Sequence, residues 1–164
     1  MSVPLATRIR DSLCVLGQIM RRQYLIKVWH MDIGEGCKIS STAKLDKTYP
    51  QGIHIGEYTA ITFGSTILTH DWINCVNRDV YIGNQCFIGA HSIILPGVRI
   101  GDSCIVAAGA LVARNVPPNS LVAGNPARVV ESNLELTRWG IRVRSQAPLA
   151  MKQPHPQEVT AFPQ

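Results

Sequence analysis

Residues 82–112 read IGNQCFIGAHSIILPGVRIGDSCIVAAGALV, and an aliphatic side chain returns at every sixth position of this stretch. The repeating positions are Ile82, Ile88, Ile94, Ile100, Val106 and Val112. A period of six fits neither the α-helical turn nor a heptad, so a helix with this pattern would spread apolar residues over its whole surface. The spacing excludes a long helix. It favours a solenoid in which each hexad forms one short strand and a turn, and stacked coils build parallel sheets.

The same period extends towards the N-terminus with two interruptions. Earlier aliphatic residues at this spacing are Ile33, Ile39 and Leu45, followed by Ile55, Ile61, Ile67 and Ile73. The step from Leu45 to Ile55 is ten residues long and contains Pro50 and Gly52, which predict a loop. The step from Ile73 to Ile82 is nine residues long, which predicts three extra residues in that coil. Loops on a solenoid often serve its binding face.

Small side chains mark the predicted corners of the solenoid. Glycine follows the aliphatic residue at Gly34, Gly56, Gly83, Gly89 and Gly101. Four places after the aliphatic residue stand Cys37, Ala43, Thr59, Ser65, Cys86, Ser92, Val98, Cys104 and Ala110. Three of the five cysteines share this phase, and the odd number without CxxC spacing indicates reduced thiols. We expect them to fill tight corners.

Composition and charge narrow the class of protein. The chain has 164 residues with 46% hydrophobic content, which predicts one soluble globular domain. No apolar run reaches the ~18 residues of a membrane span, so the cytoplasm is the default compartment. Much of the net charge of +5 lies in residues 1–30, where five basic residues face Asp11 alone. Nucleic acid is therefore not an expected partner.

The two ends fall outside the repeat. Residues 5–29 carry apolar side chains at helical spacing, namely Leu5, Ile9, Leu13, Leu16, Met20, Tyr24 and Val28. This N-terminal amphipathic helix, in residues 1–30, is expected to cover one end of the solenoid; the alternative is that its basic face rests on anionic lipid. Residues 131–164 form a C-terminal extension, with one short packed segment near Trp139 and a loose tail from Pro148.

Two of the five histidines are candidates for acid–base chemistry. His70 opens the irregular segment THDWIN, and His91 follows 21 residues later, one 18-residue coil plus the three extra residues. If those residues bulge outward, the two side chains stack on adjacent coils. His70 is the predicted general base. Asp71 and Trp72 are expected to contact an acceptor, and His91 the acceptor or a thioester.

The repeat and its corners resemble the hexapeptide-repeat acyltransferases, which include galactoside, maltose, serine and antibiotic acetyltransferases. The resemblance covers about residues 31–130 and implies a left-handed parallel β-helix of triangular cross-section. It supports His70 as the base, because ILTHDW stands where the family places its catalytic histidine.

A second matching segment is AAGALVARNVPPNSLVAGNPARVV, residues 107–130, which resembles the closing coil of the family. The resemblance implies that this segment lines the coenzyme A channel, with contacts from Ala90, Ala108, Ala113, Arg114 and Arg128. Glu131 stands where many relatives carry a basic residue, which predicts some loss of phosphate affinity.

The resemblance therefore implies an acetyltransferase that uses acetyl-CoA as co-substrate, needs no metal, and acylates a hydroxyl of a sugar or glycan precursor, as in polysaccharide biosynthesis. It also implies a homotrimer with sites between subunits, whose contacts cover outward apolar positions such as Phe87. Two alternatives stay open. A non-catalytic trimeric scaffold would leave residues 107–130 without a role, and a gamma-class carbonic anhydrase would need three zinc-binding histidines, whereas His54 is out of phase with the other two candidates.

Overall fold

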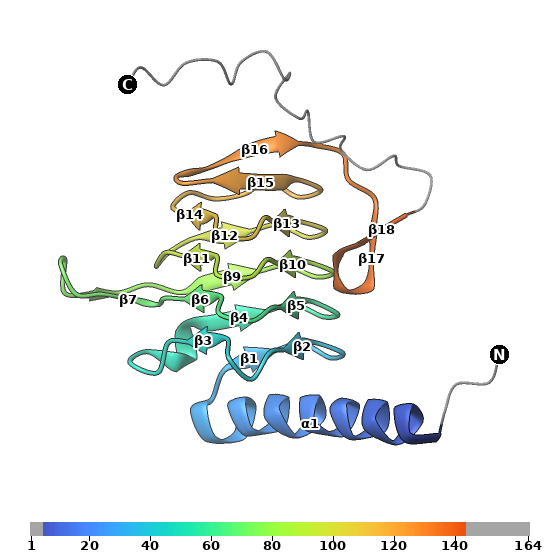
Figure 1. Ribbon diagram of the computed structural model, residues 1–164. Helices are drawn as coiled ribbons and strands as arrows, with labels where there is room; N and C mark the ends of the chain where they lie inside the picture. The colour runs from blue at the N-terminus through green and yellow to red at the C-terminus, as the bar shows by residue number, and fades with distance from the viewer. Residues whose placement is uncertain (1–4, 144–164) are drawn as a thin grey trace, which may run out of the picture.

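The computed structural model describes residues 5–143, except for the side chains of residues 5, 6 and 8–12. The tail expected from Pro148, which includes His155, lies outside the described residues. The chain begins with helix α1 (Leu5–Trp29) and continues into short strands arranged in three main sheets (Figure 1). In the described part of the chain, no helix has the length and apolar character needed to cross a bilayer.

Three parallel sheets form the walls of a stack of coils. Sheet 1 contains β1 (Asp32–Ile33), β4 (Ile53–Ile55), β9 (Val80–Ile82) and β12 (Arg99–Ile100). Sheet 2 contains β2 (Lys38–Ile39), β5 (Ala60–Ile61), β10 (Phe87–Ile88), β13 (Ile105–Val106), β15 (Leu121–Gly124) and the antiparallel β16 (Ala127–Glu131). Sheet 3 contains β3 (Lys44–Leu45), β6 (Thr66–Ile67), β11 (Ile93–Ile94) and β14 (Leu111–Val112). The chain visits sheets 1, 2 and 3 in turn, so the strands follow one another around each coil.

The register confirms the predicted repeat in most of the chain. Ile82 lies beside Ile100, and Ile88 beside Val106, one 18-residue coil apart. These side chains point inward and are buried. The predicted small corner positions are buried as well, including Cys86 and Cys104. The Sγ–H group of Cys86 donates to the Gly101 carbonyl oxygen at 3.2 Å, and contact with Cys104 together with burial raises the pKa of the Cys86 thiol well above its usual range.

The predicted phase is wrong around Ile73. Ile67 pairs with Ile94, which lies 27 positions later, so this coil has nine residues more than 18 instead of the expected three. The extra residues leave the stack as an antiparallel hairpin of β7 (His70–Asp71) and β8 (Val76–Asn77), which projects outward in Figure 1. Ile73 lies in this hairpin and is 93% exposed. An aliphatic residue in the loop had matched the repeat spacing by coincidence.

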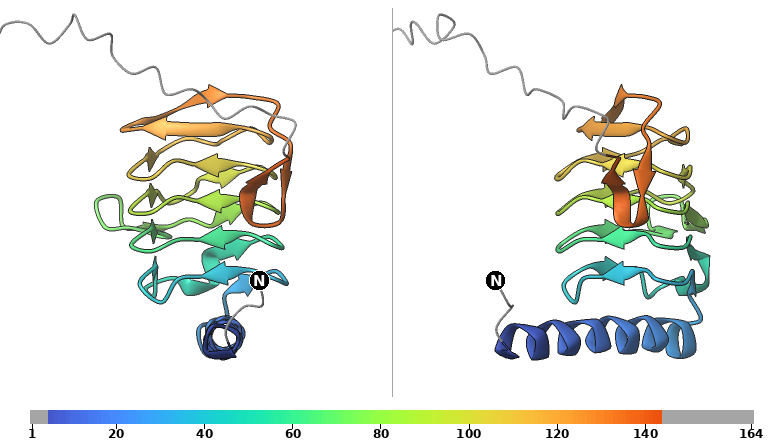
Figure 2. Two further views of the ribbon diagram at one scale, coloured as in Figure 1. Left: turned by 45° about the vertical axis from the view of Figure 1, so that its right-hand side comes forward. Right: turned by 90° about the vertical axis from the view of Figure 1, so that its right-hand side faces the viewer.

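Helix α1 covers the first coil, but with the face opposite to the predicted one (Figure 2). The Arg22 guanidinium donates to the Ile33 and Gly34 carbonyl oxygens at 2.7 and 2.8 Å, and the Gln18 side-chain oxygen accepts from the Ile39 N–H at 2.9 Å. Of the large apolar side chains on this face, Leu25 is buried. The first coil presents backbone groups that no earlier strand pairs, so polar side chains serve there better than apolar ones.

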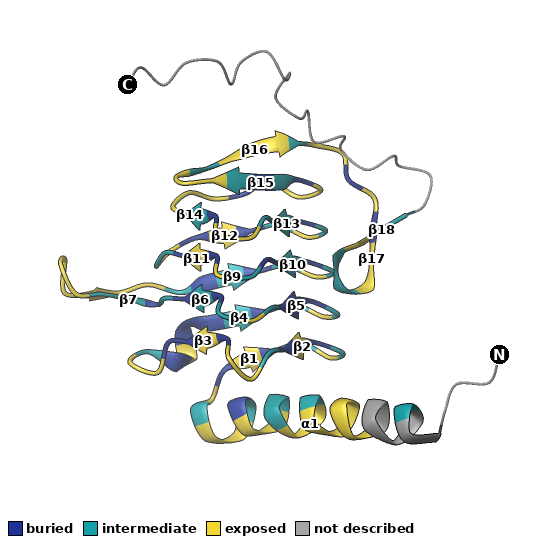
Figure 3. Cartoon of the chain, in the orientation of Figure 1, coloured by how far each residue is buried: buried dark blue, intermediate teal, exposed yellow. Residues whose placement is uncertain are grey.

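The predicted apolar stripe of α1 consequently faces solvent. Its described members Leu13, Leu16, Met20, Tyr24 and Val28 are all exposed (Figure 3). The unpaired backbone groups at the end of the first coil need hydrogen-bonding side chains, and hydrophobic periodicity does not predict which helix face supplies them.

The described part of the C-terminal extension packs along the stack. It contains β17 (Leu136–Thr137), the short 3-10 turn η2 (Arg138–Gly140) and β18 (Ile141–Arg142). The Trp139 indole N–H donates to the Gly36 carbonyl oxygen at 2.7 Å, and its backbone N–H donates to the Tyr58 carbonyl oxygen at 2.7 Å. Gly140 lies directly on Phe87, where a Cβ atom would overlap that side chain. The chain's own hairpin therefore covers part of Phe87, and the expected cover by a partner subunit stays a prediction.

We predict that Arg22→Ala lowers the free energy of unfolding by about 1.5–3 kcal/mol, since two partly buried carbonyl oxygens lose their charged donor. Gln23→Ala is the matched control: Gln23 is exposed one position along the same helix and should change stability little. Denaturant unfolding of the three proteins measures both values. Equal stabilities of the two variants would contradict a capping role for Arg22.

Candidate functional site

The most organised group of polar side chains pairs His70 with Asp46. His70 begins β7, and Asp46 follows β3 on the neighbouring coil. The Asp46 Oδ2 atom accepts from the Thr69 N–H at 2.9 Å, from the His70 N–H at 3.1 Å and from the His70 ring at Nδ1. Its Oδ1 atom accepts from the Thr48 N–H at 2.8 Å. The carboxylate is thus fixed on both oxygens and holds the imidazole in one orientation.

The environment keeps Asp46 ionised. Its side chain is only 3% exposed, and this burial alone would raise the pKa. The donors of Thr69, Thr48 and His70 outweigh it and lower the pKa of Asp46 to about 2. An ionised carboxylate only accepts hydrogen bonds, so Nδ1 of His70 must carry the proton. In the neutral form of the ring, Nε2 then carries the lone pair that a general base requires.

The hairpin places Asp71 and Trp72 differently from each other. The Asp71 carboxylate accepts from Ile73 N–H, Asn74 N–H and the Asn74 side-chain amide at 3.0, 3.1 and 2.6 Å, and these bonds, the Asn74 side chain first, lower its pKa. Asp71 therefore folds the tip of the hairpin. Trp72 is 78% exposed and meets the His70 ring edge-on, with ring centroids 5.8 Å apart. The sequence prediction that both contact an acceptor stays a prediction.

His91 does not stack on His70, and that prediction is wrong. The 27-residue coil sets His91 above Gly64, whose missing Cβ leaves room for the imidazole. The His91 ring meets Phe63 edge-on at 5.3 Å between centroids. His91 lies in the turn between sheets 2 and 3, whereas His70 lies in the turn between sheets 3 and 1. The two histidines thus occupy opposite edges of sheet 3.

Two of the predicted coenzyme A residues lie with His91. Ala90 and Ala108 occupy equivalent turn positions one coil apart, and the Gly109 N–H donates to the Ala90 carbonyl oxygen at 2.8 Å. Ala108 is exposed, and a Cβ atom on the adjacent Gly89 would overlap the backbone of that turn. This turn, the small-residue corner, offers backbone at its surface with little side-chain cover.

The other predicted coenzyme A residues lie elsewhere. Ala113 and Arg114 follow β14 and are exposed at the same edge of sheet 3 as His70. Arg128 is exposed on β16, and its guanidinium donates to the Ala127 carbonyl oxygen at 3.0 Å. Glu131 forms a two-point ion pair with Arg142, at 2.7 and 2.8 Å. One chain therefore does not gather all five predicted contacts in one place.

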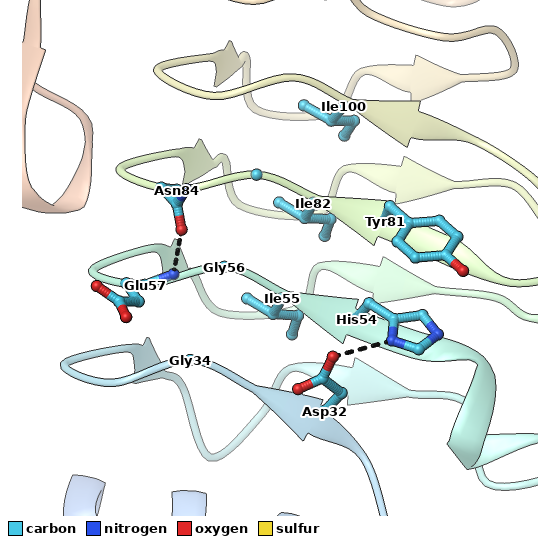
Figure 4. A pocket seen from close by; sticks show the side chains of 11 residues that line it. Asp32, Gly34, His54, Ile55, Gly56, Glu57, Tyr81, Ile82, Asn84 and Ile100 are labelled. Atoms are coloured by element: carbon cyan, nitrogen blue, oxygen red, sulfur yellow. Dashed lines mark hydrogen bonds and ion pairs between the residues drawn. The ribbon is translucent and has the colours of Figure 1, made fainter.

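A second polar group lies on the outer face of sheet 1 (Figure 4). Asp32, His54, Tyr81 and Arg99 occupy paired positions on successive strands. The His54 ring bonds Asp32 at 3.1 Å and stacks on Tyr81 at 4.4 Å, and the Arg99 guanidinium lies 3.8 Å from the other face of Tyr81. A cavity of about 350 Å³ lies along this ladder. His54 is held between these neighbours. Among the described residues, no group of three or more His, Cys, Asp or Glu side chains is arranged to hold a metal ion.

Sequence reasoning missed Asp46, the partner that orients His70. Asp46 directly follows a repeat position, Leu45, and begins the loop that interrupts the repeat. An acidic residue at the start of such a loop could indicate a partner for His70 only if the sequence also revealed that the loop on the next coil leaves the stack at the same corner.

We predict that Asp46→Asn destabilises the protein by about 2 kcal/mol at neutral pH, because a carboxyl with a lowered pKa stabilises the fold while it is ionised. The contribution is complete above the unfolded pKa near 4 and is lost as the pH falls through about 2. Unfolding free energies of both proteins between neutral and acid pH should therefore converge. Asp32→Asn, at a side chain 76% exposed, is the control. A difference that does not depend on pH would contradict this role of the Asp46 charge.

Comparison with known proteins agrees with this geometry. Residues 79–114 match the family described as bacterial transferase hexapeptide (six repeats). A Bacillus subtilis protein provisionally named acetyltransferase YvoF is 37% identical over 108 residues, which are 65% of this chain and 63% of that protein. The galactoside O-acetyltransferase of Escherichia coli is 29% identical over 143 residues, which cover 69% of each chain. The match thus spans less than two thirds of YvoF.

Solved structures show the same fold. The hexapeptide-repeat acetyltransferase VCA0836 of Vibrio cholerae, complexed with acetyl coenzyme A, superposes with a TM-score of 0.56 at 28% identity over 63% of this chain and 60% of its own. A maltose O-acetyltransferase of Clostridium difficile gives a TM-score of 0.54 at 25% identity over 70% of this chain and 75% of its own. Residues 79–114 thus carry the hexapeptide repeat of bacterial transferases, and the chain is similar in sequence and in fold to acetyltransferases of this kind.

Proposed function

We propose that this protein is an acetyl-CoA-dependent O-acetyltransferase that acts on a hydroxyl of a sugar or glycan precursor, with His70 as general base. The Asp46–His70 pair is the observation that carries the proposal, because it presents one imidazole nitrogen as a proton acceptor beside an exposed hairpin. The relatives named for acetyl transfer, two of them to a galactoside or maltose, support the reaction class.

In the proposed reaction, Nε2 of His70 removes the proton from the acceptor hydroxyl as its oxygen attacks the thioester carbonyl carbon. The tetrahedral intermediate then collapses, the carbon–sulfur bond breaks, and the proton on Nε2 passes to the departing thiolate. The products are the acetyl ester and coenzyme A. Asp46 stays ionised throughout and stabilises the imidazolium that forms in between.

Acetyl-CoA supplies the acetyl group as a co-substrate, and the small-residue corner fits a long, thin ligand. The side chains at Ala90 and Ala108 are single methyl groups, so a pantetheine arm can approach the backbone there. Arg114 and Arg128 are the proposed partners of the phosphates, since guanidinium groups bind phosphate oxygens in pairs. The charge of Glu131 is matched by Arg142, which limits the predicted loss of phosphate affinity.

We further propose that the working form is a homotrimer with one site at each subunit boundary. Sheet 3 has His70 at one edge and the small-residue corner at the other. Its outward side is partly apolar, with Ile93 39% exposed. Threefold packing about this sheet would bring the His70 edge of one subunit against the small-residue corner of the next.

We also infer that residues 31–130, the proposed catalytic domain, wind in the left-handed sense that the resemblance implies.

We predict that His70→Ala folds normally and reduces turnover by roughly 10²–10⁴, the usual contribution of a positioned base. Steady-state rates with acetyl-CoA and a panel of sugar acceptors measure the effect. His91→Ala is the comparison, because His91 lies at the opposite edge of the same sheet. Near-normal turnover of the His70→Ala variant combined with a large loss in the His91→Ala variant would move the base to His91.

A second prediction tests the shared site by mixing two inactive chains, His70→Ala and Ala108→Trp. In mixed trimers, some boundaries combine an intact His70 edge with an intact small-residue corner, so activity should reappear above that of either parent. Each parent refolded alone is the control. Verified mixed trimers without activity would contradict shared sites, and a protein that binds no acetyl-CoA at all would support the scaffold alternative.

A further inference from the structure

The outward face of α1 is an apolar surface that the described part of the chain leaves uncovered. Five large apolar side chains along this side of the helix are between 49% and 64% exposed, namely Leu13, Leu16, Met20, Tyr24 and Val28. Figure 3 shows the exposed residues along the side of the helix that faces away from the coils. Single exposed apolar residues are common, but a contiguous group of this kind usually marks an interaction site.

This apolar face is presented by the way the helix is attached. Gln18, Arg21 and Arg22 all bond to backbone groups of the first coil, so the polar side chains point inward. The helix lies crosswise under the stack in Figures 1 and 2. Its outward face therefore forms one end of the stack, opposite the end that carries β15 and β16. A flat surface, such as that of a bilayer, can contact the whole length of the helix at once.

The charge of this part of the helix indicates which kind of surface it binds. Residues 12–31 contain no acidic residue but include Arg21, Arg22 and Lys27. Lys27 is exposed and follows Met20 and Tyr24 by seven and three positions, so it lies on the outward face among the apolar side chains. Apolar side chains combined with a lysine and a tyrosine match the boundary between acyl chains and anionic headgroups, where lysine reaches up to the phosphates.

We propose that the outward face of α1 binds the surface of an anionic lipid bilayer, with the helix lying in the plane of the interface. The sequence had suggested that a basic face would rest on lipid; in the structure, two of its arginines bind the coil and the apolar face is the one available. A second copy of the chain is a poorer occupant, because pairing two such faces would bury Lys27 without an acidic partner. In the proposed trimer, three helices would share one end and bind together; this clause alone rests on the proposed function.

The test is flotation of the full chain with vesicles made of equal parts phosphatidylglycerol and phosphatidylcholine, against vesicles of phosphatidylcholine alone. We expect the protein to float with the anionic vesicles and to bind the neutral ones more weakly. The double variant Leu16→Ser, Met20→Ser should bind at least tenfold more weakly, since two apolar side chains leave the interface. Lys27→Gln should bind about fivefold more weakly and with less dependence on salt.

The matched control is the double variant Val129→Ser, Val130→Ser, which removes two similarly exposed apolar side chains on β16, at the other end of the stack from α1, and should float like the wild type. Equal flotation of all variants, or none with either vesicle, would overturn the proposal. So would sedimentation in which the wild type has twice the mass of the Leu16→Ser, Met20→Ser variant, because a second copy would then cover the face. Acetyl transfer to a water-soluble acceptor is measured on the same samples. Lipid binding without activity refutes only the proposed reaction, and activity without lipid binding refutes only this surface.

Discussion

The return of the backbone to the same three walls every 18 residues is the constraint on which this molecule depends. Each strand must find the N–H and C=O groups of the coil before it, so residues beyond the repeat cannot stay in the wall. Both surplus segments leave at the same corner, between sheets 3 and 1. The first begins with Asp46 and the second with Thr69 and His70. The Asp46–His70 pair is thus a product of where the repeat is broken.

The parts of the fold that could be predicted from the sequence are those in which a single local requirement, such as burial, determines the type of residue. Inward aliphatic positions such as Ile88 and corner positions such as Cys104 lie where the repeat puts them, because only burial decides them. Ile73 shows the limit of this reasoning, since the spacing of a side chain does not reveal whether its coil has been opened. The N-terminal helix was predictable as an element, but not its orientation, which the unpaired backbone of the first coil decides.

The candidate site divides in the same way. His70 could be found from the sequence because it opens an irregular segment, and its partner Asp46 could not, because the two are 24 positions apart and meet only through the pairing of β3 with β6. The expected stacking of His91 on His70 assumed that the coil between them has three residues more than the 18-residue repeat, whereas it has nine more. That correction separates the two histidines to the two edges of sheet 3, which is what a site divided between neighbouring subunits requires.

The C-terminal hairpin changes how such a stack can come apart. In a solenoid each repeat touches only its neighbours, so unfolding can start at either end and proceed coil by coil. Here the indole of Trp139 bonds to Gly36, 103 positions earlier, while Leu134 bonds to Asn119 near the last coil. Loosening the first coil therefore also costs contacts of the chain's last described segment. This bridge makes the unfolding of the whole array more nearly all-or-none, at the expense of a folding reaction that must wait for its most distant contact.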